Sequence, residues 1–402
     1  MTSGSTGTGV TAPAGFRAGA ATAGLKPSGR PDIALLGNGG PLDAVAAVFT
    51  ANRARAHPVL WSEQVVRSGS ARAVAVNAGN ANCYTGPDGF GVTHRTAEHV
   101  AELLSTPERE VGGGDVVVCS TGIIGVPLDT ATVLTGMSAA AADLGADAAH
   151  GLAAAEAVMT TDTRTKQAVH VHTGPAGGGW RIGGMAKGAG MLAPGLATML
   201  VHLTTDAVLD AAALDRALRA ATRVTFDRLD SDGCMSTNDT VTLMASGAGG
   251  VVPDEAEFTA ALTALCHDLA MQLLSDAEGA EHDVAIRVVG AAAEDDGVEV
   301  GRAIARSALV KTAIFGRDPN WGRILAAVGT TAAAFDPRAV DVSVNGVQVC
   351  RAGGPGEDRS GVDLSGRGVE IVVDLHAGSS GATVWTNDLT HAYVHENSAY
   401  TT

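Results

Sequence analysis

The segment 185–206 contains the residues whose types and spacing point most directly to chemistry, because a loop of small residues runs into an apolar stretch at Thr198. The loop holds three glycines, which adopt backbone angles closed to other residues, and one proline, which stiffens the chain: Gly188, Gly190, Gly195 and Pro194. This pattern predicts that Thr198 lies at a loop-to-strand junction, where backbone strain can be concentrated.

The hydroxyl of Thr198 is a weak nucleophile unless a base lies beside it. Cutting the preceding peptide bond, Ala197–Thr198, would supply that base as the free α-amine of Thr198, whose pKa is ordinarily about 8. Attack of the Thr198 Oγ on the Ala197 carbonyl gives an ester, and hydrolysis of the ester leaves Thr198 as a new N-terminus. The same residue would then be the cleavage site and the nucleophile, although a threonine in a glycine-rich loop is ordinarily structural.

The stretch 187–200 reads Lys-Gly-x-Gly-Met-x-x-Pro-x-x-Ala-Thr-Met-Leu, and it resembles the autoprocessing signature of the ornithine acetyltransferases, also called ArgJ proteins. The resemblance covers nearly the whole chain after residue 12. The other matching segments, in chain order, are Val48–Thr50, Ser120–Gly125, Met159–Thr163, Asp318–Arg323 and Glu396–Tyr400. The amino-acid sequences around Thr198 and of Phe226–Asp232 are most similar to those of actinobacterial members. The Ala- and Arg-rich, Lys-poor composition agrees with a high-GC genome.

The resemblance implies an oxyanion-stabilising pair at Thr121 and Gly122. Acyl transfer passes through tetrahedral oxyanions, so donors must face the developing charge, and in the family a Thr-Gly pair supplies a hydroxyl and a backbone N–H. By pattern alone, the same residues also fit a plain turn after a buried strand at 116–119.

The resemblance also implies a set of substrate contacts. Lys187 and Thr160 are expected at the substrate's α-carboxylate or at the nucleophile, together with Thr198 itself. Glu278, in an Asp-Ala-Glu-Gly segment, is expected to pair with the side-chain ammonium of ornithine. Asn397 and the terminal Thr402 match C-terminal substrate contacts of the family, so the tail is expected to fold back into the site.

The fold implied by the resemblance is α/β, a layered αββα-type sandwich similar to the aminopeptidase DmpA and to ornithine acetyltransferases, with an autoprocessed N-terminal threonine nucleophile. We expect a disordered tail at 1–11, an α chain at 12–197 that carries the oxyanion pair, and a β chain at 198–402 that begins with the nucleophile. The two chains are expected to stay associated, and the family suggests an α2β2 heterotetramer.

The implied activity is transfer of acetyl from N2-acetyl-L-ornithine to L-glutamate in arginine biosynthesis, through an acetyl-Thr198 intermediate in a ping-pong cycle. No metal or prosthetic group is needed, and acetyl-CoA is a co-substrate in many family members. No residue singled out in the sequence decides between one activity and both. Three alternatives stay open: a secondary-metabolism paralogue with other acyl partners, a threonine-nucleophile amidohydrolase or aminopeptidase, and an uncut binding protein.

Periodicity places several elements around these motifs. Buried strands are predicted at 73–77 and 116–119, a helix at 93–104, and a hairpin loop at 173–179. Two amphipathic helices are predicted from apolar residues at helical spacing, one through Leu214 and Leu218 with Asp206 or Asp210 as its cap, the other through 258–273. Alternating valines about Asn345-Gly346 indicate a second hairpin, and 369–375 a further strand.

Composition excludes some classes of partner. The 402-residue chain has 27 Lys+Arg against 43 Asp+Glu, a formal net charge of −16, which disfavours nucleic acids and anionic membranes. It has only four lysines: Lys26, Lys166, Lys187 and Lys311. The five cysteines are odd in number and show neither C-x-x-C nor zinc-finger spacing, which favours a reduced, cytoplasmic setting. We find no targeting signal at the N-terminus.

Other candidate sites are weaker. His170 and His172 share one face of a predicted strand as metal ligands sometimes do, but no third ligand accompanies them. The acidic run 227–239 lacks EF-hand spacing, so helix capping and loop solvation are expected to account for it. By physics alone, 318–323 is a turn with a buried Trp321 and a capping Asp318.

The chain departs from the family pattern at two places. At positions 78, 83 and 84 this chain has Ala78, Cys83 and Tyr84, where many family members have other residues. His282 occupies a position where a lysine is usual. Neither change is expected to touch the nucleophile or the oxyanion pair, but either could tune substrate preference.

Overall fold

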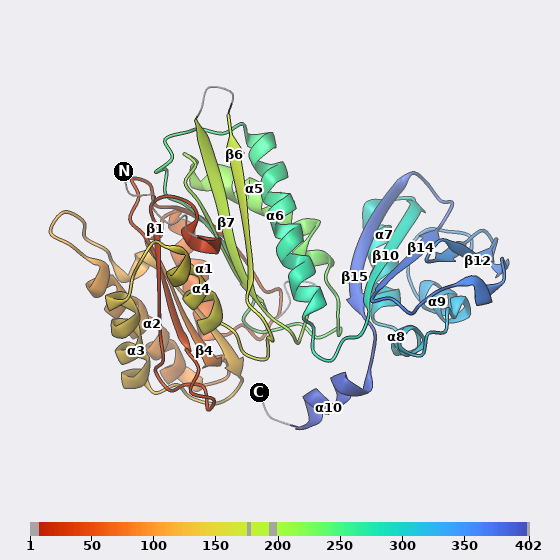
Figure 1. The fold of residues 1–402 in the computed structure, drawn as a ribbon, viewed down its shortest axis with the longest axis horizontal. Coiled ribbons are helices and arrows are strands. Elements are labelled where there is room, and N and C mark those ends of the chain that lie inside the picture. Colours follow the sequence, from red (N-terminus) through yellow and green to blue (C-terminus); the bar gives the residue numbers. More distant parts are fainter. Residues whose placement is uncertain (1–7, 175–177, 193–198, 400–402) are drawn as a thin grey trace.

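The computed structural model describes residues 8–174, 178–192 and 199–399, which form two lobes lying side by side (Figure 1). The first lobe contains a four-stranded sheet in the order β1-β2-β4-β5. Its strands are β1 (Phe16–Ala21), β2 (Ile33–Asn38), β4 (Ala73–Asn80) and β5 (Val116–Ile123). Strands β4 and β5 run parallel. The strands predicted at 73–77 and 116–119 are confirmed, and both extend further, so that β5 carries Thr121 and Gly122 near its end.

A five-stranded sheet in the order β3-β9-β8-β7-β6 forms the second layer of this lobe. Its strands are β3 (Ala44–Phe49), β9 (Thr240–Ala245), β8 (Leu200–Thr205), β7 (Gly179–Lys187) and β6 (Lys166–Thr173). The predicted hairpin is confirmed, because β6 and β7 pair antiparallel from Lys166 to Thr173. Strands β7 and β8 also pair antiparallel, with Lys187 opposite Leu200. The predicted cleavage bond lies in the connection between these two neighbouring strands.

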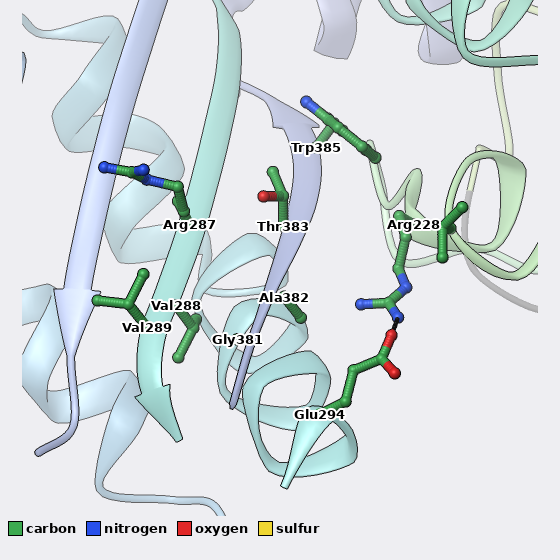
Figure 2. Close-up of a pocket in the computed structure, with 10 residues that line it drawn as sticks. Arg228, Arg287, Val288, Val289, Glu294, Gly381, Ala382, Thr383 and Trp385 are labelled. Atoms are coloured by element: carbon green, nitrogen blue, oxygen red, sulfur yellow. Dashed lines mark hydrogen bonds and ion pairs between the residues drawn. The ribbon is translucent and has the colours of Figure 1, made fainter. Parts of the chain in front are cut away.

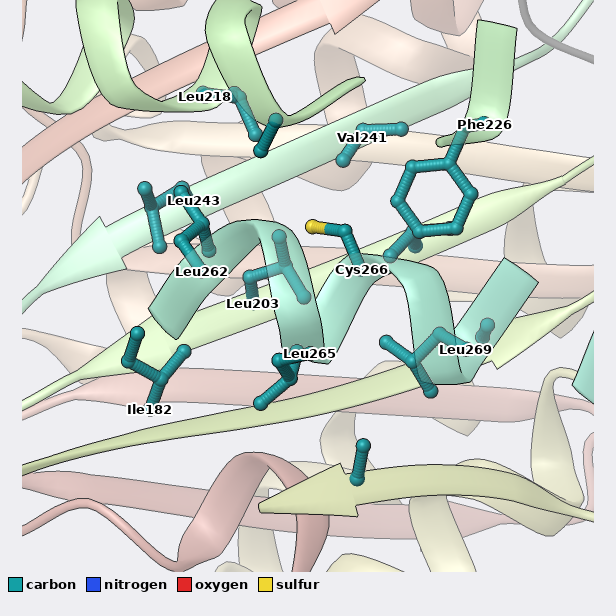
Figure 3. Packing of buried hydrophobic residues seen from close by; sticks show 14 of the residues in the cluster. Ile182, Leu203, Leu218, Phe226, Val241, Leu243, Leu262, Leu265, Cys266 and Leu269 are labelled. Carbon is teal, nitrogen blue, oxygen red and sulfur yellow. The ribbon is translucent and has the colours of Figure 1, made fainter. Parts of the chain in front are cut away.

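The two sheets pack face to face, and helices cover both outer faces, as the expected αββα sandwich requires (Figure 1). Helices α2 (Gly86–Leu104) and α3 (Thr130–Ala142) cover the first sheet, and α5 (Ala211–Arg223) and α6 (Glu255–Ser275) cover the second. Helix α1 (His57–Val65) packs on β5 and α4 (Ala148–Ala157) on β1. Figure 3 shows the apolar face of α6 directed onto the strands, with Leu262 and Leu269 among fully buried neighbours. The 3.6-residue periodicity predicted this face.

The second lobe is built on a six-stranded sheet in the order β13-β12-β11-β14-β10-β15. Its strands are β10 (Asp283–Ala291), β11 (Asp341–Val344), β12 (Val347–Arg351), β13 (Gly354–Pro355), β14 (Gly368–Asp374) and β15 (Ser380–Asn387). Helices α7 (Glu294–Ala305), α8 (Ala308–Phe315) and α9 (Trp321–Val328) pack on it around a separate apolar core. The last helix, α10 (His391–Ala399), extends back toward the sandwich (Figure 1).

Local capping explains where several helices begin. Asp210 caps α5 by accepting from the Ala213 N–H, which resolves the choice between Asp206 and Asp210. Asn320, not Asp318, caps α9, and the following Trp321 is only half-buried, so the expectation for that turn is wrong in both details. Asp318 instead accepts from the Asn320 side chain at 2.9 Å.

The N-terminal expectation also needs correction. Residues Gly9–Thr11 form a short 3-10 turn, η1, in which Val10 and Thr11 are buried. Thr11 Oγ1 donates to the Asp147 carbonyl at 3.0 Å, which ties the turn to the start of α4. The predicted disordered tail is therefore wrong for residues 8–11, and 1–7 lie outside the described residues. Within the described ranges, no helix is long and apolar enough to cross a membrane.

Candidate active site

One cavity of about 250 Å³ in the first lobe brings together six of the residues predicted for the site. Those six residues are Thr121, Gly122, Thr160, Lys187, Glu278 and Asn397. They come from β5, from the loop after α4, from the end of β7, from the turn after α6 and from α10, so distant parts of the chain converge here. Ala197, Thr198 and Thr402 lie outside the described residues, and the roles of all nine residues stay predictions.

Lys187 is the centre of the cavity's polar wall. Its side chain is buried, with 1% exposed, and its Nζ donates to Thr121 Oγ1 at 3.0 Å and to Thr160 Oγ1 at 2.9 Å. Burial lowers the pKa of Lys187, and the carboxylate of Asp162 acts in the opposite direction. Because Thr121 accepts from the ammonium, the hydrogen of its own hydroxyl is free for a second acceptor in the cavity. The arrangement suits a site where negative charge develops.

Asp162, which sequence reasoning did not single out, fixes this wall. One of its oxygens accepts from the Lys166 Nζ at 2.6 Å and from the Gly188 N–H at 2.6 Å, and the other accepts from the Thr160 N–H at 3.0 Å. Burial alone would raise the pKa of Asp162, but Lys187 and Lys166 together hold it at about 2. The ionised carboxylate therefore fixes the backbone at Thr160, whose hydroxyl accepts from Lys187, and at Gly188, which follows Lys187 in the chain.

Lys166 joins Asp162 to a second buried carboxylate, that of Asp276. Lys166 is fully buried, and its Nζ also donates to Asp276 at 2.6 Å. Asp276 accepts in turn from the Thr163 N–H at 3.1 Å and from the Thr163 hydroxyl. A buried ammonium between two carboxylates is compensated in charge and in hydrogen bonds, so it can be retained in the interior.

The Thr121–Gly122 pair lies where the β4–β5 ladder becomes irregular. Gly122 has φ +125°, and an added Cβ would lie 2.3 Å from the carbonyl carbon of Gly79. Only glycine fits such a close approach of two backbones. Ala78 lies opposite Thr121 in the ladder, so the departure from the family pattern at Ala78 lies next to the predicted oxyanion pair, closer to it than expected.

Two carboxylates also line the cavity, those of Glu278 and Asp232. Glu278 Oε2 accepts from the Asn397 side-chain amide at 3.0 Å, and an added Cβ at Gly190 would lie 2.6 Å from the same oxygen. Asp232 accepts from the Met191 N–H at 2.7 Å and from the Cys234 N–H at 3.0 Å. Burial raises the pKa of Asp232 to about 6. A cavity lined by both carboxylates and an ammonium suits a ligand that carries both charges.

Helix α10 is held against the sandwich so that Asn397 reaches the cavity. Thr390 Oγ1 donates to the Gly279 carbonyl at 2.6 Å, next to Glu278 in the chain. Tyr393, one turn before Asn397, also lines the cavity. Burial raises the pKa of the Tyr393 phenol, and the neighbouring Asp232 carboxylate acts in the same direction. The tail therefore contributes to the cavity wall, as expected for Asn397.

The second departure from the family pattern, His282, lies outside the cavity lining. Its Nδ1 pairs with Asp388 at 2.7 Å, its Nε2 contacts the Leu364 carbonyl at 3.3 Å, and its ring is buried. Asp388 lies between β15 and α10, so its pairing with His282 joins the turn after α6 to the segment that leads into that helix.

Sequence reasoning missed Asp162, Asp232 and Tyr393 at this site. Asp162 lies inside the family-like segment 159–163, which is a signal that could have found it. Asp232 ends the actinobacterial-like segment 226–232 and belongs to the acidic run 227–239, which was set aside as capping and loop solvation. Tyr393 precedes the matching C-terminal segment and gave no signal of its own.

Other parts of the surface offer less chemistry. A cavity of about 390 Å³ between η4 (Phe226–Arg228) and the edge of the second lobe contains an Arg228–Glu294 ion pair at 2.6 Å (Figure 2). None of the predicted site residues lines it. His170 and His172 stack on Trp180 with ring centroids 5.5 and 4.8 Å away, and no metal-binding group of His, Cys, Asp or Glu is found among the described residues.

The amino-acid sequence of the chain is similar to those of known proteins over nearly its whole length. A family model described as the ArgJ family matches residues 17–402. The chain belongs to the ArgJ family. A relative from Streptomyces coelicolor named "Arginine biosynthesis bifunctional protein ArgJ" is 58% identical over 391 residues, covering 97% of this chain and 99% of that protein. A relative of the same name from Thermobifida fusca is 58% identical over 393 residues, covering 98% of this chain and 100% of that protein.

Solved structures of the ArgJ family include ornithine acetyltransferase complexed with ornithine from Mycobacterium tuberculosis. It is 48% identical to the matched part, with a TM-score of 0.45, and the match covers 48% of this chain and 96% of that one. The structure of ArgJ from Bacillus halodurans matches with 36% identity and a TM-score of 0.46, over 49% of this chain and 97% of that one. The suspected family membership is confirmed by the family model and the actinobacterial relatives.

Proposed function

We propose that this ArgJ-family chain is an acetyltransferase of arginine biosynthesis that moves acetyl from N2-acetyl-L-ornithine to L-glutamate. The observation that carries the proposal is the Lys187 ammonium held between the Thr121 and Thr160 hydroxyls, in a cavity that Glu278 also lines. The relatives' names favour this activity over a secondary-metabolism paralogue or an amidohydrolase.

The nucleophile of the proposed reaction is Thr198, released by cleavage of the Ala197–Thr198 bond. Its position in the chain supports this, because it lies between Lys187 at the end of β7 and Leu200 at the start of β8, which are opposite each other in the sheet. A cut here leaves both chains paired in one sheet, so 12–197 and 198–402 stay associated without a covalent bond. An α2β2 assembly of the resulting chains remains part of the proposal.

In the first half-reaction, the α-amine of Thr198 accepts the proton of its hydroxyl, and Oγ attacks the acetyl carbon of acetylornithine. The Thr121 hydroxyl, whose oxygen is already bonded to Lys187, donates to the oxyanion together with the Gly122 N–H. Collapse of the tetrahedral intermediate breaks the C–N bond, and ornithine leaves after its nitrogen takes the proton from the α-amine. In the second half-reaction, the amine of glutamate attacks the acetyl ester by the same steps in reverse order.

The charges of the cavity support the assignment of substrate contacts. Both substrates carry an α-carboxylate, which suits Lys187 and Thr160. The side-chain ammonium of ornithine suits Glu278, which Asn397 holds in place. No step requires a metal or prosthetic group. Because the relatives are named bifunctional, we also propose that acetyl-CoA can donate acetyl to Thr198.

The proposed setting is the reducing cytoplasm. The five cysteines are free, and four of them are buried, so the fold does not rely on disulfides for stability.

Mass spectrometry of the purified chain combined with an activity assay tests the proposal. We expect two fragments that meet at Ala197/Thr198 and glutamate-dependent release of ornithine from acetylornithine. Thr198→Ala should stay a single chain and be inactive, while Thr205→Ala, at the far end of β8 and outside the cavity lining, should be cut. A folded wild type that stays uncut, or a cut protein that releases acetate without requiring glutamate, would contradict the proposal.

A further inference from the structure

The described lining of the proposed substrate cavity has more acidic than basic side chains. Its ionisable groups include one ammonium, that of Lys187, and two carboxylates, those of Glu278 and Asp232. The residues outside the described ranges contain no Lys, Arg or His, so their side chains cannot add a cation. The cavity therefore suits a ligand with a positive side chain better than one with a negative side chain.

The two carboxylates lie close to each other, because adjacent residues contact both of them. The Met191 N–H donates to Asp232 Oδ2 at 2.7 Å. A Cβ added to Gly190, the preceding residue, would lie 2.6 Å from Glu278 Oε2. Covalent geometry between that Cβ and the Met191 nitrogen keeps the two carboxylate oxygens within about 9 Å of each other. A ligand group that lies between them can contact both.

The two acetylated amino acids of the proposed cycle have side chains of opposite charge. N2-acetylornithine and N-acetylglutamate carry the acetylated nitrogen and the α-carboxylate on the same carbon, so their α-carboxylates meet the same groups and their side chains enter the same region. The side-chain amine of ornithine has a pKa of about 10, and the side-chain carboxyl of glutamate has one of about 4. Ornithine therefore brings an ammonium to the two carboxylates, whereas glutamate brings a third carboxylate.

Three carboxylates in one small cavity cannot all stay ionised without a large cost. Like charges that share a site raise the pKa of one group until it binds a proton. A protonated carboxyl then gains an O–H donor, which can form a hydrogen bond to the remaining carboxylate. Glutamate can therefore bind where ornithine binds if one acid of the cavity takes up a proton.

Asp232 is the better placed of the two acids for this role. Burial raises the pKa of Asp232 to about 6, and Glu278 acts in the same direction, while two backbone N–H groups and the Lys311 ammonium act in the opposite direction. Lys311, from α8, lies outside the cavity lining and donates to the Ser231 carbonyl at 2.5 Å. Glu278 Oε2 accepts from the Asn397 amide at 3.0 Å, and a carboxylate suits that donor.

Two further titratable side chains lie beside Asp232, and neither supplies a charge at neutral pH. Burial raises the pKa of the Cys234 thiol, and Asp232 acts in the same direction. Burial also raises the pKa of the Tyr393 phenol, where Asp232 and Glu278 again act in the same direction. Both groups therefore stay neutral, and the charge near Asp232 depends on the carboxyls and on the ligand.

We propose that Asp232 is the residue through which the site accepts glutamate, by taking up one proton from solvent when the side-chain carboxylate binds and donating it to that carboxylate in a hydrogen bond. The proton returns to solvent when N-acetylglutamate leaves. With ornithine bound, Asp232 is ionised and adds to the attraction of Glu278 for the ammonium. This inference rests on the proposed function, because it requires that one cavity binds both amino acids.

The relative use of the two acetyl donors at different pH tests the assignment. In a ping-pong cycle, kcat/KM for each donor reports its own half-reaction from the free enzyme. Dividing kcat/KM for N-acetylglutamate, measured with ornithine as acceptor, by that for N2-acetylornithine, measured with glutamate, cancels the titration of the shared nucleophile. Neither donor's side chain titrates between about pH 6 and pH 9.

For the wild type, we expect this ratio to level off below about pH 6 and to fall about tenfold per pH unit between about pH 7 and pH 9, because one proton must be bound. In Asp232→Asn, which is uncharged at every pH, the ratio should change by less than about threefold over the same range. A wild-type ratio that does not depend on pH would overturn the assignment. A variant that keeps the full slope would also overturn it.

Asp230→Asn is the matched control. Asp230 lies two residues away, is fully buried and has a pKa raised by burial, but it pairs with Arg306 at 2.7 Å and does not line the cavity. This variant should keep the wild-type slope, and loss of the slope in both variants would count against a specific role for Asp232. Absence of acetyl transfer between ornithine and glutamate in either direction would instead contradict the proposed function.

Calorimetry on the mature wild type tests proton uptake without any variant. Glutarate and 5-aminovalerate are glutamate and ornithine without the α-amine, so they cannot react. Binding heats at pH 7.5 in two buffers with different heats of ionisation give the number of protons bound with each ligand. We expect about one proton with glutarate and about none with 5-aminovalerate. Equal numbers for the two ligands would overturn the proposal.

Discussion

Replacing Asp162 by asparagine should destabilise the protein by removing one buried charge while keeping the side chain's shape. In the folded chain, Lys187 and Lys166 hold the pKa of Asp162 at about 2, below its ordinary 3.8, although burial acts in the opposite direction. Each unit of depression corresponds to about 1.4 kcal/mol, so this carboxylate contributes roughly 2 kcal/mol at neutral pH. Because Lys166 keeps its second partner, Asp276, the expected loss is about 2 to 3 kcal/mol and not the larger cost of an isolated buried charge.

The sign of the pH dependence follows from the lowered pKa. Stability from Asp162 is fully present above pH 3.8, its unfolded value, and is lost as the pH falls through about 2. Urea unfolding at pH 7 should therefore show the full difference between wild type and Asp162→Asn. Asp215→Asn is the control, because its pair with Arg219 is exposed and is worth little. Equal unfolding free energies for the two variants would refute this account of the buried charges.

Three further perturbations have expected outcomes. Gly122→Ala should abolish acetyl transfer, measured as N-acetylglutamate formed, because its Cβ would lie 2.3 Å from a Gly79 backbone atom; a variant with wild-type kcat would contradict the close approach. Glu278→Gln should raise KM for acetylornithine about tenfold or more while changing KM for glutamate little, since only ornithine carries a side-chain ammonium; equal changes would remove Glu278 from ammonium recognition. Lys311→Met should lower the unfolding free energy by about 2 to 4 kcal/mol. Lys311 Nζ donates to the Ser231 carbonyl at 2.5 Å and to the Thr386 hydroxyl at 3.0 Å, and the substitution would remove the donor from both buried oxygens. An unchanged urea midpoint would contradict this expectation.

Elements with a strong local signal could be predicted from the sequence. The apolar stripe of α6 and the valine alternation around Asn345 depend only on neighbours along the chain, and both are present in the structure. The predicted cap Asp318 was wrong, because Asn320 carries an equally suitable side chain and only the backbone geometry shows that Asn320 accepts from the Arg323 N–H.

The residues that converge on the cavity were predicted through a family resemblance and not through periodicity. Thr121, Thr160 and Lys187 are far apart in the sequence, and no local pattern shows that one ammonium joins the two hydroxyls. Burial was the property that sequence reasoning missed most clearly. The acidic run 227–239 looked like a solvated loop, but Asp230 and Asp239 are fully buried.

The four lysines show the same limit. Their scarcity was visible in the composition, but the structure shows that all four are buried, including Lys26, whose Nζ donates to the carbonyls of Pro31 and Ala157. In each case, oxygen atoms from distant segments surround the ammonium. Such compensation depends on tertiary contacts, which composition does not encode.

The central claim is that acetyl is carried on Thr198. Intact mass spectrometry of the mature protein, mixed with N2-acetylornithine in the absence of glutamate, tests this claim directly. The account predicts that the 198–402 chain gains the mass of one acetyl group, that the group maps to Thr198, and that added glutamate removes it as N-acetylglutamate. An enzyme that transfers acetyl at full rate without acetylating that chain, or that carries the group on another residue, would contradict the account.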